Sequence, residues 1–156
     1  GRILVVAGSR LARDHQERRA GFDAIMVQRF PDLEVAASIE GRNDPAHIRS
    51  TLERVFDQHT DIVGIYSSAA GNRGLIDFLR SPMAPRDLVV IAHELTPTSR
   101  EALASGLYDA LISQDSGHII RSAVRVLRSA TDDEPIDPKQ ERIRTDIYLA
   151  ENLPPA

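Results

Sequence analysis

Small polar or ionisable residues follow the apolar runs of this chain, and their types suit contact with a polar ligand. The runs and the residues after them are Ile3–Ala7 with Gly8-Ser9, Val35–Ala37 with Ser38, Ile62–Tyr66 with Ser67-Ser68, Leu88–Ala92 with His93-Glu94, and Ala110–Ile112 with Ser113-Gln114. In an open parallel sheet the carboxyl ends of the strands line one crevice, and ligands bind there. The pattern therefore indicates a binding surface at one edge of a sheet.

The pair His93-Glu94 has the residue types of a general base and of an acid that orients it. Adjacent residues of an extended strand point to opposite sides, so the two side chains need not act together. Hydrogen bonding of His93 to a polar ligand is the favoured interpretation. Catalysis by His93 and a purely structural role stay open as alternatives.

Arg18 and Arg19 lie in a segment whose apolar residues have roughly helical spacing. A helical arginine usually faces solvent. An arginine near the start of a helix and beside strand ends can instead donate two hydrogen bonds to a hydroxylated or carboxylated ligand. Asn72 and Gln114 offer amides that both donate and accept hydrogen bonds. Arginine, histidine and amides without a nucleophile or a metal cluster favour a sugar or polyol site over an active site.

Several other functions lack their sequence motifs. Gly8 stands without the further glycines of the dinucleotide fingerprint, and no phosphate-binding loop is present, with Lys139 as the only lysine. Residues 64–68 (GIYSS) do not match the nucleophile elbow G-x-S-x-G. The chain has no cysteine and five scattered histidines, so no metal site is predicted and no cofactor is implied.

The composition is that of one globular domain. The 156 residues are 42% hydrophobic and 27% charged, with a formal net charge of −4. This charge gives no electrostatic reason for the chain itself to bind DNA or an anionic membrane. No apolar stretch approaches the ~20 residues of a membrane-spanning helix. The chain starts without Met and already inside a predicted strand, as expected of a fragment whose preceding residues lie upstream.

Apolar runs alternate with helical patterns, which predicts an α/β fold. Helices are expected over Asp14–Phe30, Asp44–Gln58, Asn72–Leu79, Pro97–Ala104 and His118–Ala130. Asp44-Pro45 and Thr96-Pro97 each supply an N-cap followed by proline at the first helical position. The strand runs lack strict alternation, as strands buried on both faces do. The order predicts a doubly wound, mostly parallel sheet with helices on both faces.

The C-terminal part departs from this pattern. His118–Ala130 has a wide apolar stripe from Ile119 to Leu127, which covers either this sheet or another lobe. Residues 130–141 have the composition of an exposed linker. Arg142–Leu149 then alternates between apolar and polar residues, which predicts a half-exposed strand at a sheet edge.

Segments along nearly the whole chain resemble, in the same order, the effector domain of LacI/GalR-type transcriptional regulators. The segments are Ile3–Ser9, Glu17–Phe22 with its R-x-x-G-F helix start, Val89–Thr96, Ala110–Asp115 with its late Q-D pair, and Arg144–Leu149 with Glu151–Pro154. These regulators share the domain with periplasmic sugar-binding proteins. The resemblance implies one lobe of a periplasmic-binding-protein-like type I fold, in which two lobes close on a ligand.

On this resemblance, residues 1–115 form the C-terminal lobe, residues 116–141 form a helix and linker that pack on or cross to the missing lobe, and residues 142–156 form a returning strand and tail. The DNA-binding helix-turn-helix and most of the N-terminal lobe would be absent from this chain. If the apolar stripe of the last helix lacks that lobe, we expect a homodimer with exchanged C-terminal segments.

The resemblance also implies six ligand contacts by position. The six are Arg18, Asn43, Ser68, Asn72, His93 and Gln114. Arg18 falls at the family's ligand-binding arginine, and Gln114 matches its late polar contact. Asn43 stands where an aromatic residue often stacks on the sugar ring, and Ser68 stands where asparagine is common. Asn72, one helical turn beyond Ser68, is expected to substitute for that asparagine.

The resemblance implies effector binding in a LacI-type allosteric regulator of the cytoplasm. The effector would be a sugar or a related polar small molecule. A domain outside this chain would bind the operator DNA. A transport-type periplasmic sugar-binding protein of the same fold is the first alternative. A small α/β enzyme that uses His93 is the second. His93 stands where this family commonly has aspartate, and together with Asn43 and Ser68 it argues against the usual hexose or pentose as ligand. The loss of the aromatic platform at position 43 favours a smaller or more polar ligand.

Overall fold

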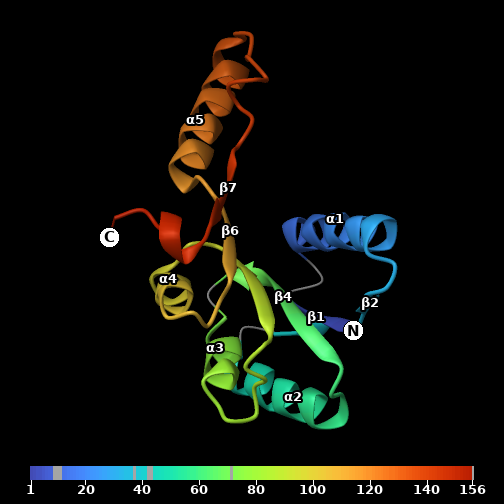
Figure 1. Cartoon of the computed structure of the whole chain (residues 1–156). Coiled ribbons are helices and arrows are strands. Elements are labelled where there is room, and N and C mark those ends of the chain that lie inside the picture. The colour runs from blue at the N-terminus through green and yellow to red at the C-terminus, as the bar shows by residue number, and fades with distance from the viewer. Residues whose placement is uncertain (9–11, 37, 42–43, 71, 156) are drawn as a thin grey trace.

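One mostly parallel sheet forms the centre of the structure (Figure 1). This computed structural model describes residues 1–8, 12–36, 38–41, 44–70 and 72–155. The strands are β1 (Arg2–Ala7), β2 (Glu34–Val35), β3 (Ile39–Glu40), β4 (Ile62–Ala70), β5 (Val89–His93), β6 (Ala110–Gln114) and β7 (Thr145–Tyr148). Their order is β2-β1-β4-β5-β6-β7, with β3 also paired to β1. The described pairs are parallel except β6 with β7, which confirms the predicted α/β class.

The helices begin close to the capping signals in the sequence. They are α1 (Arg13–Arg29), α2 (Pro45–Gln58), α3 (Arg73–Leu79), α4 (Pro97–Ala104) and α5 (Ser116–Asp132), with a short 3-10 turn η1 (Ala150–Asn152) near the C-terminus. The Asp44 side chain caps α2, and Thr96 forms a reciprocal capping box with Ser99 at the start of α4. Helix α5 begins before the predicted start because Asp115 caps it by accepting a hydrogen bond from the His118 backbone N–H at 2.8 Å.

The sheet face under α2, α3 and α4, here called the closed face, holds the main apolar core. Leu4, Val90 and Leu111 from three strands and Phe78 from α3 all belong to one buried cluster. Helix α3 packs closely on α2, since a Cβ on Gly74 would lie 2.2 Å from the backbone oxygen of Pro45. This close packing fixes the start of α3, which follows the carboxyl end of β4.

The opposite face, here called the open face, is covered by α1 alone. The Phe22 ring of α1 stacks on Tyr66 of β4 with ring centroids 4.6 Å apart. Farther along this face the cover ends, and Val89 of β5 and Ile147 of β7 are 52% and 61% exposed. Helices therefore lie on both faces, as predicted, but they cover the two faces unequally.

Helix α5 projects away from the sheet and lies on neither face (Figure 1). The chain then returns alongside α5 and forms β7, which pairs antiparallel with β6 at the sheet edge. The clean alternation of residues 142–149 predicted an edge strand, and β7 confirms it. Tyr148 packs on the core while Ile147 faces solvent. In the part of the chain that the structure describes, none of the helices combines the length and apolar character that crossing a bilayer requires.

Candidate ligand-binding site

The strand order creates a crevice at the carboxyl ends of β1 and β4. The chain leaves β1 toward β2 and β3 on one side and later returns to β4 on the other side, so the direction of winding reverses between β1 and β4. The connections after these strands run to opposite faces of the sheet, and ligands of open α/β sheets bind at such a point. The start of α1 and the end of β4 meet here, which places Arg18 beside Ser68.

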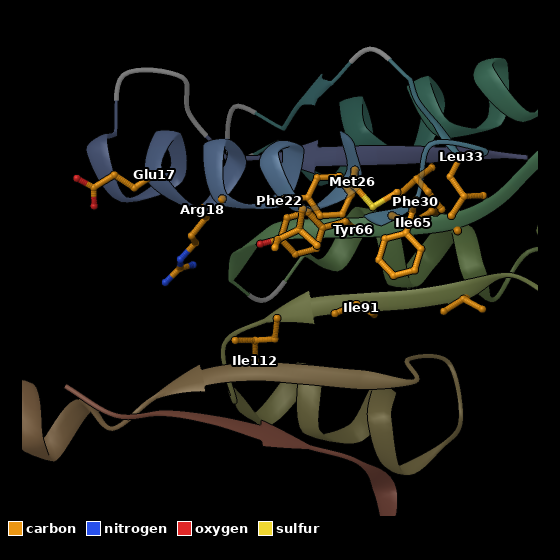
Figure 2. A pocket seen from close by; sticks show the side chains of 15 residues that line it. Glu17, Arg18, Phe22, Met26, Phe30, Leu33, Ile65, Tyr66, Ile91 and Ile112 are labelled. Atoms are coloured by element: carbon orange, nitrogen blue, oxygen red, sulfur yellow. The ribbon is translucent and has the colours of Figure 1, made fainter. Parts of the chain in front are cut away.

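Arg18 is the central charged group of this site. Its Nη1 donates a hydrogen bond to the backbone oxygen of Ser68 at 3.0 Å. Its Nη2 forms an ion pair with Oε1 of Glu94 at 2.6 Å. The Arg18 side chain keeps 17% of its surface exposed and reaches from α1 toward the strand ends (Figure 2). A guanidinium has five N–H donors, so these two bonds leave donors for a further partner.

Glu94 joins Arg18 to the ends of β5 and β6. Its second oxygen, Oε2, accepts hydrogen bonds from the Gln114 backbone N–H at 3.0 Å and from the Ser113 hydroxyl at 3.2 Å. The Ser113 hydroxyl in turn accepts a hydrogen bond from the Leu95 backbone N–H at 3.2 Å. We call Arg18, Ser68, Glu94, Ser113 and Gln114 the Arg18–Glu94 network. Four segments far apart in sequence therefore hold one cation and one carboxylate together.

His93 takes a different partner from its neighbour Glu94. The His93 Nε2 lies 2.9 Å from the Tyr66 hydroxyl, and the two rings meet edge to face. Burial, together with the nearby positive charge of Arg18, lowers the pKa of His93 to about 4. The imidazole is thus neutral at neutral pH. Among the described residues no hydrogen bond joins His93 to Glu94, since Glu94 is bonded to Arg18 and His93 to Tyr66. The two residues therefore do not form an acid–base pair.

Ser68 and Asn72 lie at the carboxyl end of β4 and are both buried. The Ser68 hydroxyl has no hydrogen-bond partner among the described residues, while its backbone oxygen receives Arg18. The Asn72 side chain caps α3 by accepting a hydrogen bond from the Leu75 backbone N–H at 3.2 Å, and its amide donates to the Ser67 hydroxyl at 3.4 Å. Asn72 therefore positions the start of α3 whatever else it contacts.

Of the remaining candidate residues, Gln114 lies in the site and Arg19 makes its contacts elsewhere. Gln114 is the exposed last residue of β6, and its backbone belongs to the Arg18–Glu94 network. Arg19 points elsewhere, to Asp23 and the Ser38 hydroxyl. Asn43 lies outside the described residues. The sequence did not identify Glu94 as the partner of Arg18. Sequence position alone could pair Glu94 only with its neighbour His93.

The site as a whole is electrically balanced. The Glu94 carboxylate offsets the Arg18 guanidinium, His93 is neutral, and amide and hydroxyl groups complete the surface. No group of three or more side chains suited to a metal occurs among the described residues. Such an array can donate hydrogen bonds to an uncharged polar ligand and accept them from it.

The comparisons with known proteins agree with this fold. A family model described as "Periplasmic binding protein domain" matches residues 1–135. The chain belongs to the periplasmic binding protein domain family. A search of curated proteins found no significant match.

Three solved structures place this periplasmic binding protein domain among larger relatives. A sugar-binding protein of a sugar ABC transporter from Bacillus halodurans has 21% identity and a TM-score of 0.81, with 97% of this chain and 56% of that chain covered. A carbohydrate transporter solute-binding protein from Agrobacterium radiobacter, in complex with D-arabinose, has 16% identity and a TM-score of 0.84, with 97% and 52% covered. GanP, a glucose-galactose binding protein from Geobacillus stearothermophilus, has 16% identity and a TM-score of 0.84, with 97% and 54% covered. The chain thus spans about half the length of these structures.

Proposed function

We propose that this domain is one wall of a binding cleft for an uncharged, polyhydroxylated small molecule of the sugar class. The observation that carries the proposal is the Arg18–Glu94 ion pair at the switch point between β1 and β4. The pair offers strong hydrogen-bond donors and acceptors with little net charge. Sugar hydroxyls both donate and accept hydrogen bonds, so they need partners of each kind. An anionic ligand at the remaining N–H donors of Arg18 would lie beside the Glu94 carboxylate and would be repelled by it. The names of the similar structures, which include arabinose- and glucose-galactose-binding proteins, support the same class.

Ligand-observed saturation-transfer NMR at millimolar concentration tests this proposal, because a single wall binds weakly. We expect neutral pentoses and hexoses to give signals that the matching sugar acids do not. Arg18→Ala and Glu94→Gln should each weaken binding about tenfold or more, since each removes a charge-assisted hydrogen bond. Arg49→Ala is the matched control, because Arg49 pairs with Glu53 on α2 and should leave binding unchanged. A preference for sugar acids, or equal loss in all three variants, contradicts the proposal.

At the level of the whole protein, we propose solute capture for transport as the first role. The names of the three similar structures, all transport or sugar-binding proteins, support it over regulation. A LacI-type regulator is the second candidate, supported by the ordered resemblance of Glu17–Phe22, Ala110–Asp115 and Arg144–Leu149 to that family. The reading frame upstream of Gly1 separates the two. An export signal there supports transport and periplasmic location, and a helix-turn-helix supports cytoplasmic regulation.

Catalysis by His93 has weaker support. Its Nε2 is already engaged by the Tyr66 hydroxyl, only 6% of the residue is exposed, and Glu94 is bonded to Arg18 instead. A substrate panel compared between the unmodified chain and His93→Ala tests this alternative. Turnover that disappears in the variant would overturn the pure-binding proposal.

A further inference from the structure

Helix α5 and the segment that follows it are tied to each other. Within residues 116–144, here called the α5 unit, the Arg125 guanidinium donates to both carboxylate oxygens of Glu141 at 2.7 and 2.8 Å. The His118 Nε2 lies 2.8 Å from the backbone oxygen of Gln140. These contacts join α5 to its own return segment, while the helix projects away from the sheet (Figure 1). The position of the α5 unit therefore depends on its two connections to the sheet.

Both connections leave the sheet at one point. Strand β6 ends at Gln114 and β7 begins at Thr145, and these two residues are partners in the antiparallel register. Only Asp115 separates Gln114 from the first residue of α5. The chain beyond β7 is fixed to the sheet, since Leu153 packs against the buried core. The pair Gln114–Thr145, here called the pivot, therefore sets the direction of the α5 unit.

Glu94 connects this pivot to the candidate site. Its Oε2 accepts hydrogen bonds from the Gln114 backbone N–H at 3.0 Å and from the Ser113 hydroxyl at 3.2 Å. Its Oε1 pairs with Nη2 of Arg18 at 2.6 Å. The three bonds use most of the roughly four acceptor positions of a carboxylate. Glu94 therefore acts mainly by holding Arg18 and the last residues of β6 in one arrangement.

The backbone of Glu94 is itself held in place. Its carbonyl oxygen accepts hydrogen bonds from the Ser99 hydroxyl at 2.6 Å and from the Thr96 backbone N–H at 3.0 Å, within the capping box that starts α4. Ser99 is 1% exposed, so this anchor is buried. The Glu94 side chain thus extends from a fixed backbone, with Arg18 on one oxygen and the pivot on the other. Groups that share one such network are energetically coupled.

We propose that Glu94 is a positioning residue that couples ligand contact at Arg18 to the direction of the α5 unit. The inference rests on the proposed function, in which sugar hydroxyls bind the free N–H donors of Arg18. A ligand that fixes the guanidinium also fixes the Glu94 carboxylate, and through Oε2 it steadies the last residues of β6. The coupling is reciprocal, so a change at the pivot alters ligand affinity by the same factor.

Hydrogen exchange of the Gln114 amide, measured by NMR without any ligand, is the first test. This N–H donates to Glu94, and Glu94→Gln should speed its exchange about fivefold, because a neutral acceptor forms a weaker hydrogen bond. The printed bonds of Arg18 go to Ser68 and Glu94 and none goes to β6. Arg18→Ala should nevertheless speed the same exchange about threefold, and this effect should disappear in the double variant with Glu94→Gln.

Arg19→Ala is the matched control for Arg18→Ala. Arg19 is the next residue of α1 and pairs with Asp23 at 2.7 Å, outside the Arg18–Glu94 network, so its loss should leave Gln114 exchange unchanged. Arg18→Lys keeps a positive charge beside Glu94 and should restore part of the protection. Circular dichroism checks that each variant folds. Three results each overturn the proposal: no acceleration in Arg18→Ala, equal acceleration in Arg19→Ala, or an Arg18→Ala effect that persists in the double variant.

Addition of sugar is the second test. D-Arabinose and D-glucose at millimolar concentration should slow Gln114 exchange in the unmodified chain, and they should not slow it in Glu94→Gln at the same fractional saturation. Sugar that binds without slowing this exchange overturns the coupling and leaves the proposed function intact. If neither sugar binds, the proposed function fails, and the ligand-free measurements still decide whether Glu94 links Arg18 to the pivot.

Discussion

The closed and open faces of the sheet are built from the same strands but serve different purposes. On the closed face, α2, α3 and α4 bury one continuous apolar cluster. On the open face, α1 covers only part of the sheet, and the remainder divides into a polar network at the strand ends and a bare apolar groove. The closed face therefore supplies most of the stability of the lobe. The open face keeps its polar groups at the strand ends accessible to a ligand.

The two faces should differ most in the stability lost when one phenylalanine on each face is replaced by alanine. Phe78 on the closed face is 0% exposed, whereas Phe22 on the open face is only partly buried. We expect Phe78→Ala to lower the free energy of unfolding by about 3–5 kcal/mol, from lost transfer energy and the cavity left behind. Phe22→Ala should cost about 1–2 kcal/mol, because part of its ring surface already contacts water. Urea denaturation measures both, and equal losses would contradict the comparison.

The open face should also make stability depend on pH through His93. Its pKa in the folded state, about 4, lies below the ordinary value of 6.5. As pH falls from 6.5 to 4 the unfolded chain therefore takes up a proton that the folded chain does not. The contribution of His93 to the free energy of unfolding is therefore fully present above pH 6.5. It is lost as the pH falls from 6.5 to 4, by up to about 3 kcal/mol.

Denaturation at a series of pH values measures this effect of His93. In His93→Gln, whose amide stays neutral and can also form a hydrogen bond with the Tyr66 hydroxyl, the decline between pH 6.5 and 4 should be smaller. The control His47→Gln changes an exposed histidine on α2 and should keep the full decline. Identical pH profiles in the two variants would show that burial of His93 does not limit stability.

The smallest effect concerns two neighbouring valines of β5 that point to opposite faces. Val90 is 1% exposed on the closed face, and Val89 is 52% exposed on the open face. We expect Val90→Ala to cost about 2 kcal/mol and Val89→Ala less than about 0.5 kcal/mol at low protein concentration. Urea midpoints of the two variants give both values, and equal losses of stability would contradict this contrast between the faces.

Much of the fold could be predicted from the sequence because its signals are local. Asp44-Pro45 and Thr96-Pro97 mark the starts of α2 and α4, and both caps are present in the structure. The alternation of residues 142–149 predicted the edge strand β7. The single run predicted at 35–37 is instead two short strands, Glu34–Val35 and Ile39–Glu40, both paired with β1. So short a segment carries little periodic signal, and its pairing depends on β1.

The candidate site could be predicted only in part. The sequence singled out His93 by its position after a strand, and Arg18 by its place near a helix start and by the family resemblance. The partners were not visible, since Glu94 is 76 residues from Arg18 and Tyr66 is 27 residues from His93. Such pairs depend on which strands lie next to each other. The roles of all the candidate residues toward a ligand, Arg18 and His93 included, stay predictions.

By itself, the sequence determined the α/β class, the helix starts and the concentration of polar residues at the strand ends, because propensity, capping and hydrophobic pattern act over a few residues. The tertiary structure alone decided that Arg18 is neutralised by Glu94, that His93 is held neutral beside Tyr66, and that α5 leaves the sheet. Those outcomes depend on burial and on contacts between segments far apart in the chain. The apolar stripe of α5 was evident in the sequence, but its exposure within this chain was not.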